Sequence, residues 1–355
     1  MRGCKSLGIS WGTIGKIPSR LKGAIAMRIC FYSMREFDEL PMAQELSRET
    51  GIEFVHTTEY PNDFNIELAR GCDAISFTPC DMSAGVLDRF AEVGVRYALC
   101  RSIGYDHVDL AHAREIGLHV DNVSYPPSAV ADYTLLLTLA ALRRLPHILE
   151  RARMQDYTLR GKIGRDLSQL TVGVLGTGRI GTAVIRRLSG FGCKIMAFDA
   201  YENDEAASMA TYASLDEVLA ASDVVTLHMN ANDSNHHIID ADAIARMPQG
   251  AVVVNTARGK LVDTAALIDG IRTGHLGGAA LDVLEHENGL YYYDRVGDVI
   301  DNDQLAVLKS FPNVIVSPHT AFYTDVSVRN MVKGNFDSLA AFESGEKDAG
   351  LEVLA

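Results

Sequence analysis

Residues 172–181 read Val-Gly-Val-Leu-Gly-Thr-Gly-Arg-Ile-Gly, so Gly176, Gly178 and Gly181 have the spacing G-x-G-x-x-G. The apolar run 171–176 predicts a strand that leads into these glycines, and a helical pattern follows them. A glycine turn between a strand and a helix lets the backbone approach a pyrophosphate, whose charge the helix amides hold. The stretch therefore predicts a dinucleotide-binding turn. The alternative is a turn whose glycines only pack the helix on the strand.

Two charged residues near this turn refine the prediction. Asp199 ends the next predicted strand, about 20 residues beyond the glycines, where an acid accepts hydrogen bonds from the adenine ribose and repels a 2′-phosphate. Its position favours NAD over NADP as the cofactor. Arg179 lies between the second and third glycines, and the sequence leaves open whether its side chain reaches a phosphate or faces solvent.

Apolar runs alternate with amphipathic stretches along most of the chain, and strands that alternate with helices in this way predict βαβ units and parallel sheets. We expect two sets of such units. The first set has predicted strands at 27–33, 52–56, 73–78 and 96–101 and helices near 38–49, 64–70 and 83–91. The second has predicted strands at 171–176, 194–199, 223–229, 251–257, 278–283 and 313–317 and helices that start near Gly178, Asp216, Asp240 and Asp263.

A long helical pattern over 128–151 separates the two sets. Ser128 is expected to cap this helix, and its apolar face is predicted to bury Val130, Tyr133, Thr134, Leu137 and Ala141. A last helical pattern at 324–345 has no strand after it and is expected to return to the first set.

The fold predicted from these patterns is α/β, with two Rossmann-like or flavodoxin-like domains, parallel sheets and an active-site cleft between the domains. We expect a substrate-binding domain formed by residues 27–127 plus 323–355. Residues 128–322 are expected to form the NAD-binding domain.

Composition excludes several classes of protein. The 355 residues are 47% hydrophobic and 22% charged, and the net charge of −13 argues against nucleic acid or an anionic membrane as partner. The longest apolar run, 134–142, is too short to cross a bilayer. Six cysteines without a Cys-x-x-Cys pair favour reduced thiols in a cytoplasm, and neither a disulfide scaffold nor a metal site is expected.

Residues 1–26 differ from the rest of the chain, because they contain basic residues but no acid. They are either a targeting leader or the product of a translation start placed too early. We favour the second interpretation, because Met27-Arg-Ile-Cys-Phe-Tyr reads directly as an opening strand.

Three titratable residues follow predicted strands of the second set: Arg258, Glu287 and His319. The carboxyl ends of parallel strands line the ligand crevice of an open α/β sheet, so we expect these side chains to face the cofactor. Reduction of a 2-oxo acid needs a guanidinium that binds the substrate in a planar fork, and an imidazolium that donates a proton to oxygen. It also needs a carboxylate that favours and orients the imidazolium. Asp282, at the end of its strand, is expected to meet the nicotinamide carboxamide or ribose.

Each member of this trio also has a simpler interpretation. Arg258 fits a loop salt bridge, Glu287 a solvated charge in an acidic stretch, and His319 the cap of a turn. We interpret His228 as a core histidine on an inner strand and His286 as a weaker alternative to His319. The histidines interpreted as structural or surface residues are His56, His107, His112, His119, His147, His236, His237 and His275.

These residues, in this order, resemble the D-2-hydroxyacid dehydrogenase family and its D-lactate dehydrogenase branch, including the vancomycin-resistance type. The spacing of the trio carries the resemblance, together with the segments 101–109, 121–126 and 317–324. The resemblance covers nearly the whole chain from Met27. It implies a two-domain enzyme that is usually a homodimer formed through the cofactor domains, with helix 128–151 in the contact.

The resemblance also implies roles for single residues. Arg258, Glu287 and His319 match the catalytic residues, and the amides near Ile103 and Gly104 match the loop that holds the substrate carboxylate. The substrate pocket is matched by Tyr125 and Phe322, and the cofactor contacts by Arg179, Ile180, Asp199, Met229, Asn230, Thr256, Ala257, Asp282 and, less closely, Asn235. Two features depart from the family: Met229-Asn230 stands where many members carry proline, and the basic leader has no counterpart.

The expected function is that of an NAD-dependent D-lactate dehydrogenase, which reduces pyruvate reversibly with His319 as general acid and base. One alternative is a dehydrogenase for larger 2-oxo acids such as phenylpyruvate or 2-oxoisocaproate. The tyrosines within 289–298 either form a lid over an apolar substrate or pack on a neighbouring subunit. Another alternative is a regulator that binds NAD on the same fold without turnover.

Overall fold

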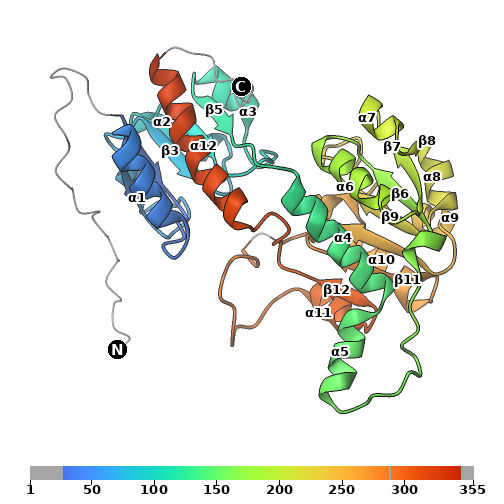
Figure 1. Cartoon of the computed structure of the whole chain (residues 1–355). Coiled ribbons are helices and arrows are strands. Elements are labelled where there is room, and N and C mark those ends of the chain that lie inside the picture. The colour runs from blue at the N-terminus through green and yellow to red at the C-terminus, as the bar shows by residue number, and fades with distance from the viewer. Residues whose placement is uncertain (1–26, 288, 345–355) are drawn as a thin grey trace. The chain divides into compact units, whose positions relative to one another are not determined.

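The computed structural model describes residues 27–287 and 289–344. The chain divides into two compact units, which are drawn in Figure 1. Of the described residues, unit 1 comprises 27–126 and 324–344, and unit 2 comprises those within Pro127–Tyr323. The basic segment before Met27 lies outside the described residues, so both interpretations of it stay open.

Unit 1 contains a five-stranded parallel sheet with the order β2-β1-β3-β4-β5, which is the flavodoxin-like order. Four strands lie where the sequence predicts them. The fifth was not predicted, because its sequence, His-Val-Asp-Asn, lacks an apolar run. The strands are β1 (Arg28–Phe31), β2 (Glu53–His56), β3 (Ala74–Phe77), β4 (Tyr97–Cys100) and β5 (His119–Asn122).

Helices from both ends of the chain cover this sheet. The last helix, α12, packs against α1, and its residues Val332, Phe336 and Leu339 join Ile29 and Phe31 in one buried cluster. The buried residues of α2 and α3 belong to a second cluster, which contains other residues of the strands. The helices are α1 (Glu39–Thr50), α2 (Ala84–Glu92), α3 (Leu110–Glu115) and α12 (Asp325–Ser344).

The prediction of an α-helix at 64–70 is wrong. The segment forms only the short 3₁₀ helix η1 (Ile66–Ala69). The side chain of Asn65 accepts a hydrogen bond from the Asn62 amide at 2.8 Å and donates one to the Tyr60 carbonyl at 2.8 Å. Such bonds between a short polar side chain and nearby backbone compete with α-helical bonding.

Unit 2 contains a seven-stranded parallel sheet with the order β12-β11-β10-β9-β6-β7-β8. Counted from β6, this is the order of a dinucleotide-binding fold with one strand added. The strand order reverses between β6 and β9, and ligands of such sheets bind at the carboxyl ends of the strands beside this point. The strands are β6 (Thr171–Leu175), β7 (Lys194–Phe198), β8 (Thr211–Tyr212), β9 (Val224–Leu227), β10 (Ala251–Asn255), β11 (Leu276–Leu281) and β12 (Val314–Val316).

The single helix predicted at 128–151 is wrong, because two helices occupy this region: α4 (Ser128–Leu142) and α5 (Leu145–Arg153). Arg144 between them has a left-handed φ of +51°, and Pro146 follows in the first turn of α5. Proline cannot continue a helix from the preceding turn, so the chain must break here. The N-cap prediction for Ser128 is also wrong: Pro127, with φ already fixed near its helical value, holds the N-cap position without a side-chain hydrogen bond.

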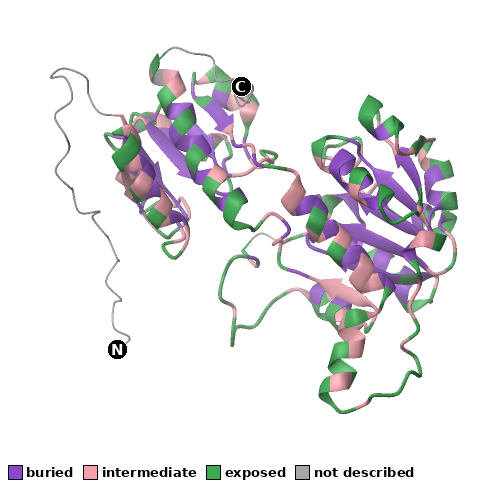
Figure 2. Cartoon of the chain, in the orientation of Figure 1, coloured by how far each residue is buried: buried purple, intermediate pink, exposed green. Residues whose placement is uncertain are grey.

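The other helices of unit 2 connect its strands, and they include the short helix η3 after β10. In Figure 2 the strands of both sheets are mostly buried while the helices expose their outer faces. No helix among residues 27–287 and 289–344 is long and apolar enough to span a membrane. These helices are α6 (Arg179–Ser189), α7 (Asp204–Ala207), α8 (Leu215–Ala221), α9 (Ala241–Arg246), η3 (Gly259–Leu261), α10 (Thr264–Arg272) and α11 (Asp303–Ser310).

Candidate active site

Two of the three glycines after β6 lie where no side chain fits. Gly176 has a φ of +95°, and a Cβ there would lie 2.7 Å from the carbonyl carbon of His228. A Cβ on Gly181 would lie 1.9 Å from the carbonyl oxygen of Gly176, so α6 packs directly on the turn. These two glycines allow the tight turn and the close approach of helix and strand.

Gly178 has a different role, because a Cβ there would meet nothing within 4 Å. It is exposed and is the N-cap of α6. The first amides of a helix have no partner within the helix, so open space beside them suits an anion. The turn therefore fits the pyrophosphate of a dinucleotide.

Asp199 follows β7 and lies beside the same turn. Its Oδ2 accepts hydrogen bonds from the Thr177 amide at 2.5 Å and the Thr177 hydroxyl at 3.2 Å, and its Oδ1 accepts one from the Tyr201 amide at 3.1 Å. An ionised carboxylate held here can accept hydrogen bonds from a ribose and would repel a 2′-phosphate. The position of Asp199 thus fits NAD.

The other positions predicted to contact the cofactor also lie at this edge of the sheet or at the start of α6. Asn235 closes the loop after β9, because its amide donates to the Asn230 carbonyl at 2.7 Å and its Oδ1 accepts from the Asn232 amide at 2.8 Å. The cofactor contacts themselves remain predictions. Arg179 and Ile180 begin α6, Met229 and Asn230 follow β9, and Thr256 and Ala257 follow β10.

Glu287 and His319 come from different loops and meet directly. His319 Nδ1 lies 2.7 Å from Glu287 Oε1, and Glu287 Oε2 accepts a hydrogen bond from the Leu284 amide at 2.8 Å. The two side chains are 24% and 21% exposed. A carboxylate at Nδ1 fixes the orientation of the ring. Among the described residues, His319 Nε2 makes no hydrogen bond, so it is the nitrogen available to a substrate.

Asp282 holds the loop that carries His319. It is fully buried; its carbonyl accepts a hydrogen bond from the His319 amide at 2.7 Å. Its carboxylate accepts bonds from the Ser317 hydroxyl at 2.6 Å and from the amides of Thr320 at 3.0 Å and Ala321 at 2.8 Å. These bonds keep His319 at a φ of +52°, a conformation that costs a non-glycine residue about 1 kcal/mol or more. In this structure Asp282 positions His319, and its predicted contact with nicotinamide remains a prediction.

Arg258 lies at the end of β10, next to the strand that leads to Glu287. Its Nη1 donates to the Ala257 carbonyl at 2.7 Å. A Cβ on Gly259 would lie 2.1 Å from the Leu284 carbonyl, so the turn at Arg258 packs closely against the segment before Glu287. The trio therefore follows three adjacent strands, β10, β11 and β12.

Three tyrosines after Glu287 occupy different surroundings. Tyr291 is buried in the core of unit 2, and burial raises the pKa of its hydroxyl. Tyr292 donates a hydrogen bond to the His319 carbonyl at 3.1 Å, and its ring centroid lies 5.9 Å from that of His319 and 6.4 Å from that of Phe322. Tyr293 is exposed. Within the described residues, Tyr292 is thus the tyrosine of this loop that stands beside the catalytic candidates.

His228, predicted as a core histidine on a strand, instead directly follows β9 and lies behind the glycine turn. Its Nε2 is 2.9 Å from the Thr226 hydroxyl, and its Nδ1 is buried without a hydrogen-bond partner among the described residues. Burial lowers the pKa of this imidazole to about 3, so it is neutral near pH 7.

In unit 1, a buried arginine that sequence analysis did not single out supports the loop predicted to bind a carboxylate. Arg101 directly follows β4 and is fully buried. It donates to the Ser76 hydroxyl and the Tyr32 carbonyl, both at 2.7 Å, and pairs with the buried Glu39 at 3.3 Å. A charged residue at the end of an apolar strand was the signal available in the sequence.

The loop itself is tied down by side chains on both sides. The side-chain amide of Asn122 donates through Nδ2 to the Ile103 carbonyl at 2.7 Å, and the Ser102 hydroxyl donates to the Gly104 carbonyl at 2.5 Å. Tyr125, predicted to line the substrate pocket, is buried in the same unit. The structure thus shapes the backbone at Ile103 and Gly104, whose substrate contacts remain predictions.

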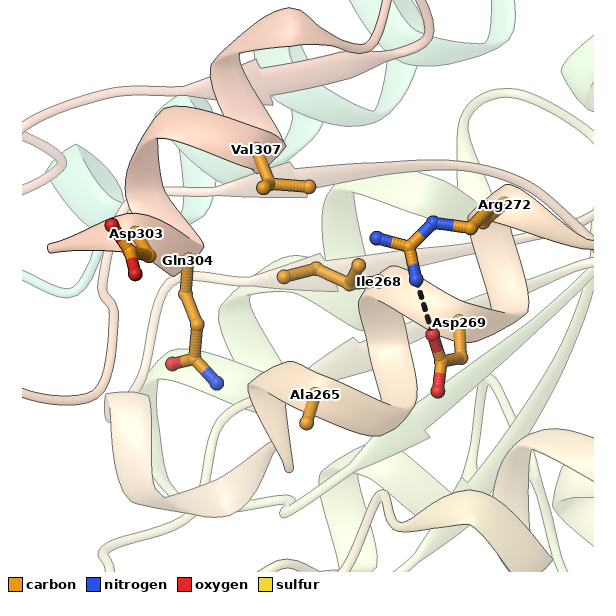
Figure 3. A pocket seen from close by; sticks show the side chains of 7 residues that line it. All are labelled: Ala265, Ile268, Asp269, Arg272, Asp303, Gln304 and Val307. Carbon is orange, nitrogen blue, oxygen red and sulfur yellow. Dashed lines mark hydrogen bonds and ion pairs between the residues drawn. The ribbon is translucent and has the colours of Figure 1, made fainter.

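A shallow pocket of about 240 Å³ between α10 and α11 lies outside this site. In Figure 3 the side chains of Asp269 and Arg272 pair with each other at 2.7 Å, and Asp303 lies apart from this pair. Arg272, the one basic residue that lines the pocket, is therefore already paired. It is lined by Ala265, Ile268, Asp269, Arg272, Asp303, Gln304 and Val307.

Comparisons with known proteins agree with this geometry. Residues 135–321 match the family model described as "D-isomer specific 2-hydroxyacid dehydrogenase, NAD binding domain". An aromatic 2-oxoacid reductase of Clostridium sporogenes is 40% identical over 324 residues, which cover 89% of this chain and 96% of the relative. A D-lactate dehydrogenase of Lactiplantibacillus plantarum is 36% identical over 327 residues, covering 91% and 98% of the two chains.

A solved structure gives the same result. The D-isomer-specific 2-hydroxyacid dehydrogenase of Lactobacillus delbrueckii ssp. bulgaricus, in its NAD-complexed form, is 30% identical and superimposes with a TM-score of 0.80, covering 92% of this chain and 100% of that one. The glycine turn, Asp199 and the pairing of Glu287 with His319 are the features such an enzyme needs. The chain therefore belongs to the NAD-binding D-isomer-specific 2-hydroxyacid dehydrogenase family.

Proposed function

We propose that this dehydrogenase reduces pyruvate to D-lactate, using Arg258, Glu287 and His319. The observation that carries the proposal is the 2.7 Å contact between His319 Nδ1 and Glu287 Oε1, which leaves Nε2 for the substrate oxygen. The D-lactate dehydrogenase among the relatives supports pyruvate as the substrate.

The glycine turn and Asp199 would hold NADH, which would supply the hydride for C2 of the oxo acid. The imidazolium of His319 donates its Nε2 proton to the carbonyl oxygen as negative charge develops there. Glu287 holds the orientation of the His319 ring through Nδ1, and Arg258 orients the substrate and stabilises the charge on oxygen. In the oxidation of D-lactate, neutral His319 accepts the hydroxyl proton.

Contacts with the rest of the substrate are proposed from the family likeness. The backbone amides at Ile103 and Gly104 bind the carboxylate, and Tyr125 and Phe322 line the space for the group attached to C2.

A second candidate function is the reduction of aromatic 2-oxo acids. It is favoured by the rings of Tyr292 and Phe322, which lie about equally far from the ring of His319, at 5.9 and 6.3 Å. Aromatic rings beside the reacting atoms can stack on a phenyl substituent or fill the volume that it would need. The aromatic 2-oxoacid reductase among the relatives supports stacking of these rings on a phenyl substituent.

The test is NADH oxidation by the purified full chain with pyruvate, 2-oxobutyrate, 2-oxoisocaproate and phenylpyruvate. The proposal predicts the highest kcat/KM with pyruvate. A preference for phenylpyruvate would replace it with the second candidate and keep the catalytic trio. A preference for 2-oxobutyrate or 2-oxoisocaproate would contradict both substrate assignments and also keep the trio. Binding of NADH without turnover of any substrate would contradict both.

Two substitutions of Tyr292 show what its ring does. Tyr292→Phe removes the hydrogen bond to the His319 carbonyl, worth about 1 kcal/mol, but keeps the ring. Tyr292→Ala also removes the ring, so kcat/KM for phenylpyruvate should rise relative to pyruvate if the ring limits the pocket, and fall if it stacks on the substrate. Tyr293→Phe is the matched control.

We also propose that the enzyme is a cytoplasmic homodimer formed through unit 2. Apolar side chains exposed on α4, α5 and the segment after them support this contact, since such patches mark interfaces. Free thiols at all five described cysteines suit a reducing compartment. Light scattering of the eluted protein checks the dimer, and a monomer would contradict it. The exposed side chains include Leu136, Leu149, Met154, Tyr157, Leu159 and Ile163.

A further inference from the structure

Outside the reaction centre, His236, His237 and Glu285 come together on unit 2. One ligand atom from each side chain lies within 4.8 Å of the ligand atoms of the other two. His236 is exposed, and the other two are partly buried. Imidazole nitrogens with a carboxylate oxygen are a ligand set of transition-metal ions such as Zn²⁺, whereas Mg²⁺ and Ca²⁺ prefer oxygen alone.

The backbone brings the two histidines to the same side of the chain. His237 has a left-handed φ of +53°, and its amide donates to the Lys260 carbonyl at 2.9 Å. The two rings are stacked, with centroids 3.9 Å apart. A non-glycine residue keeps such a conformation only where its surroundings hold it, because the conformation costs about 1 kcal/mol or more. The backbone that places His237 beside His236 is therefore held by the fold.

Neighbouring groups orient the ligand atoms. Glu285 Oε2 accepts hydrogen bonds from the Thr264 amide at 3.0 Å and the Thr264 hydroxyl at 2.7 Å, while Oε1 lies 2.7 Å from His237 Nε2. On the other side of the ring, His237 Nδ1 lies 4.0 Å from a carboxylate oxygen of Asp263. Metal ligands are usually supported in this way, with hydrogen bonds to the outer carboxylate oxygen and a carboxylate near the outer imidazole nitrogen.

We propose that His236, His237 and Glu285 bind a divalent transition-metal ion of the Zn²⁺ class. The ion takes the place of the hydrogen between His237 Nε2 and Glu285 Oε1, and the neutral ring then carries its hydrogen on Nδ1, on the side of Asp263. The exposed His236 side chain rotates to supply the third ligand, and water completes the coordination. The site is separate from Arg258, Glu287 and His319, so it adds a binding property to the dehydrogenase.

Titration of the full chain with Zn²⁺ tests this proposal, after treatment with a chelator and its removal. Calorimetry should show a Zn²⁺ site that Mg²⁺ does not occupy, and Zn²⁺ should raise the melting temperature. His236→Ala should weaken Zn²⁺ binding about tenfold or more. His147→Ala, which removes a histidine of α5, is the matched control and should leave binding unchanged.

A second variant separates the site from adventitious binding. Glu285→Gln keeps the size of the side chain and an acceptor for Thr264 but removes the anionic ligand, so it should also weaken Zn²⁺ binding. Equal Zn²⁺ affinity in wild type, His236→Ala and Glu285→Gln would overturn the proposal, as would the absence of Zn²⁺ binding to wild type. If Glu285→Gln fails to fold, the exposed His236 alone decides.

Discussion

The glycine turn and the His319 loop lie at the carboxyl ends of the same sheet but are built in opposite ways. The turn depends on residues without a side chain, since a Cβ on Gly176 or Gly181 would collide with backbone atoms. The His319 loop depends on an acceptor, because the carboxylate of Asp282 accepts hydrogen bonds from Ser317, Thr320 and Ala321 of that loop. Adding an atom should therefore break the first region, and removing a charge should break the second.

The largest effect, a loss of kcat, is expected from a change of the His319 side chain. His319→Gln removes the proton donor, so kcat should fall about 10³-fold while the affinity for NADH changes little. Stopped-flow turnover and fluorescence titration with NADH measure the two quantities. His286→Gln, which changes an exposed histidine that does not pair with Glu287, is the control. Retained turnover in His319→Gln would remove His319 from its assigned role.

The glycine turn offers a pair of substitutions that should separate stability from cofactor binding. Gly181→Ala should destabilise the protein by roughly 3 kcal/mol, because its Cβ would lie 1.9 Å from a backbone oxygen. Gly178→Ala has room for its Cβ, so the stability should change by less than about 1 kcal/mol while NADH binds more weakly. Chemical denaturation and NADH titration of both variants check this. Equal stability of the two would show that the turn is not packed as described.

Asp282 tests whether the His319 loop depends on its acceptor. Asp282→Asn keeps the shape but loses the charge and one acceptor, so we expect a loss of about 2 kcal/mol in stability and a lower kcat. Ser317→Ala removes one of the donors and should cost less. Denaturation curves and kcat for both variants decide the point. A larger loss in Ser317→Ala than in Asp282→Asn would contradict the assignment of Asp282 as the centre of the loop.

The last effect depends on pH and concerns the imidazole behind the glycine turn. Because burial lowers the pKa of His228 to about 3, the unfolded chain binds a proton there between roughly pH 6.5 and 3 and the folded chain does not. The free energy of unfolding should therefore decrease as the pH is lowered through this window, by at most about 1.4 kcal/mol per pH unit. Denaturation of wild type and His228→Gln at pH 7 and pH 5 isolates the contribution. An equal loss in both would exclude His228.

The two regions also differ in what sequence reasoning reaches. The glycine turn was predictable because its chemistry lies in the backbone and its spacing lies within one short stretch. The positions of Glu287 and His319 after their strands were predictable from parallel-sheet topology. The left-handed backbone of His319 and the role of Asp282 in holding it were not, because hydrogen bonds between distant segments determine them.

Elements with weak local signals account for the errors in the fold. Helix α4 was extended through Arg144 because the apolar period continues past the break, whereas the position of Pro146 argues for two helices. The polar strand β5 and the two-residue strand β8 were not predicted, because pairing with a neighbour defines them more than their own residues do. The grouping of His236 and His237 with Glu285 was not predicted for a similar reason, since Glu285 is distant in sequence.

The helix α12 has a consequence for how the chain is made. Unit 2 is continuous in sequence, whereas unit 1 needs α12, from near the end of the chain, to cover Ile29 and Phe31. During synthesis on the ribosome, the sheet of unit 1 emerges first but keeps one apolar face uncovered until Val332, Phe336 and Leu339 have been translated. The nascent chain can therefore complete unit 2 before unit 1, although the strands of unit 1 are synthesised first. The uncovered sheet of unit 1 is then a segment that a chaperone would protect.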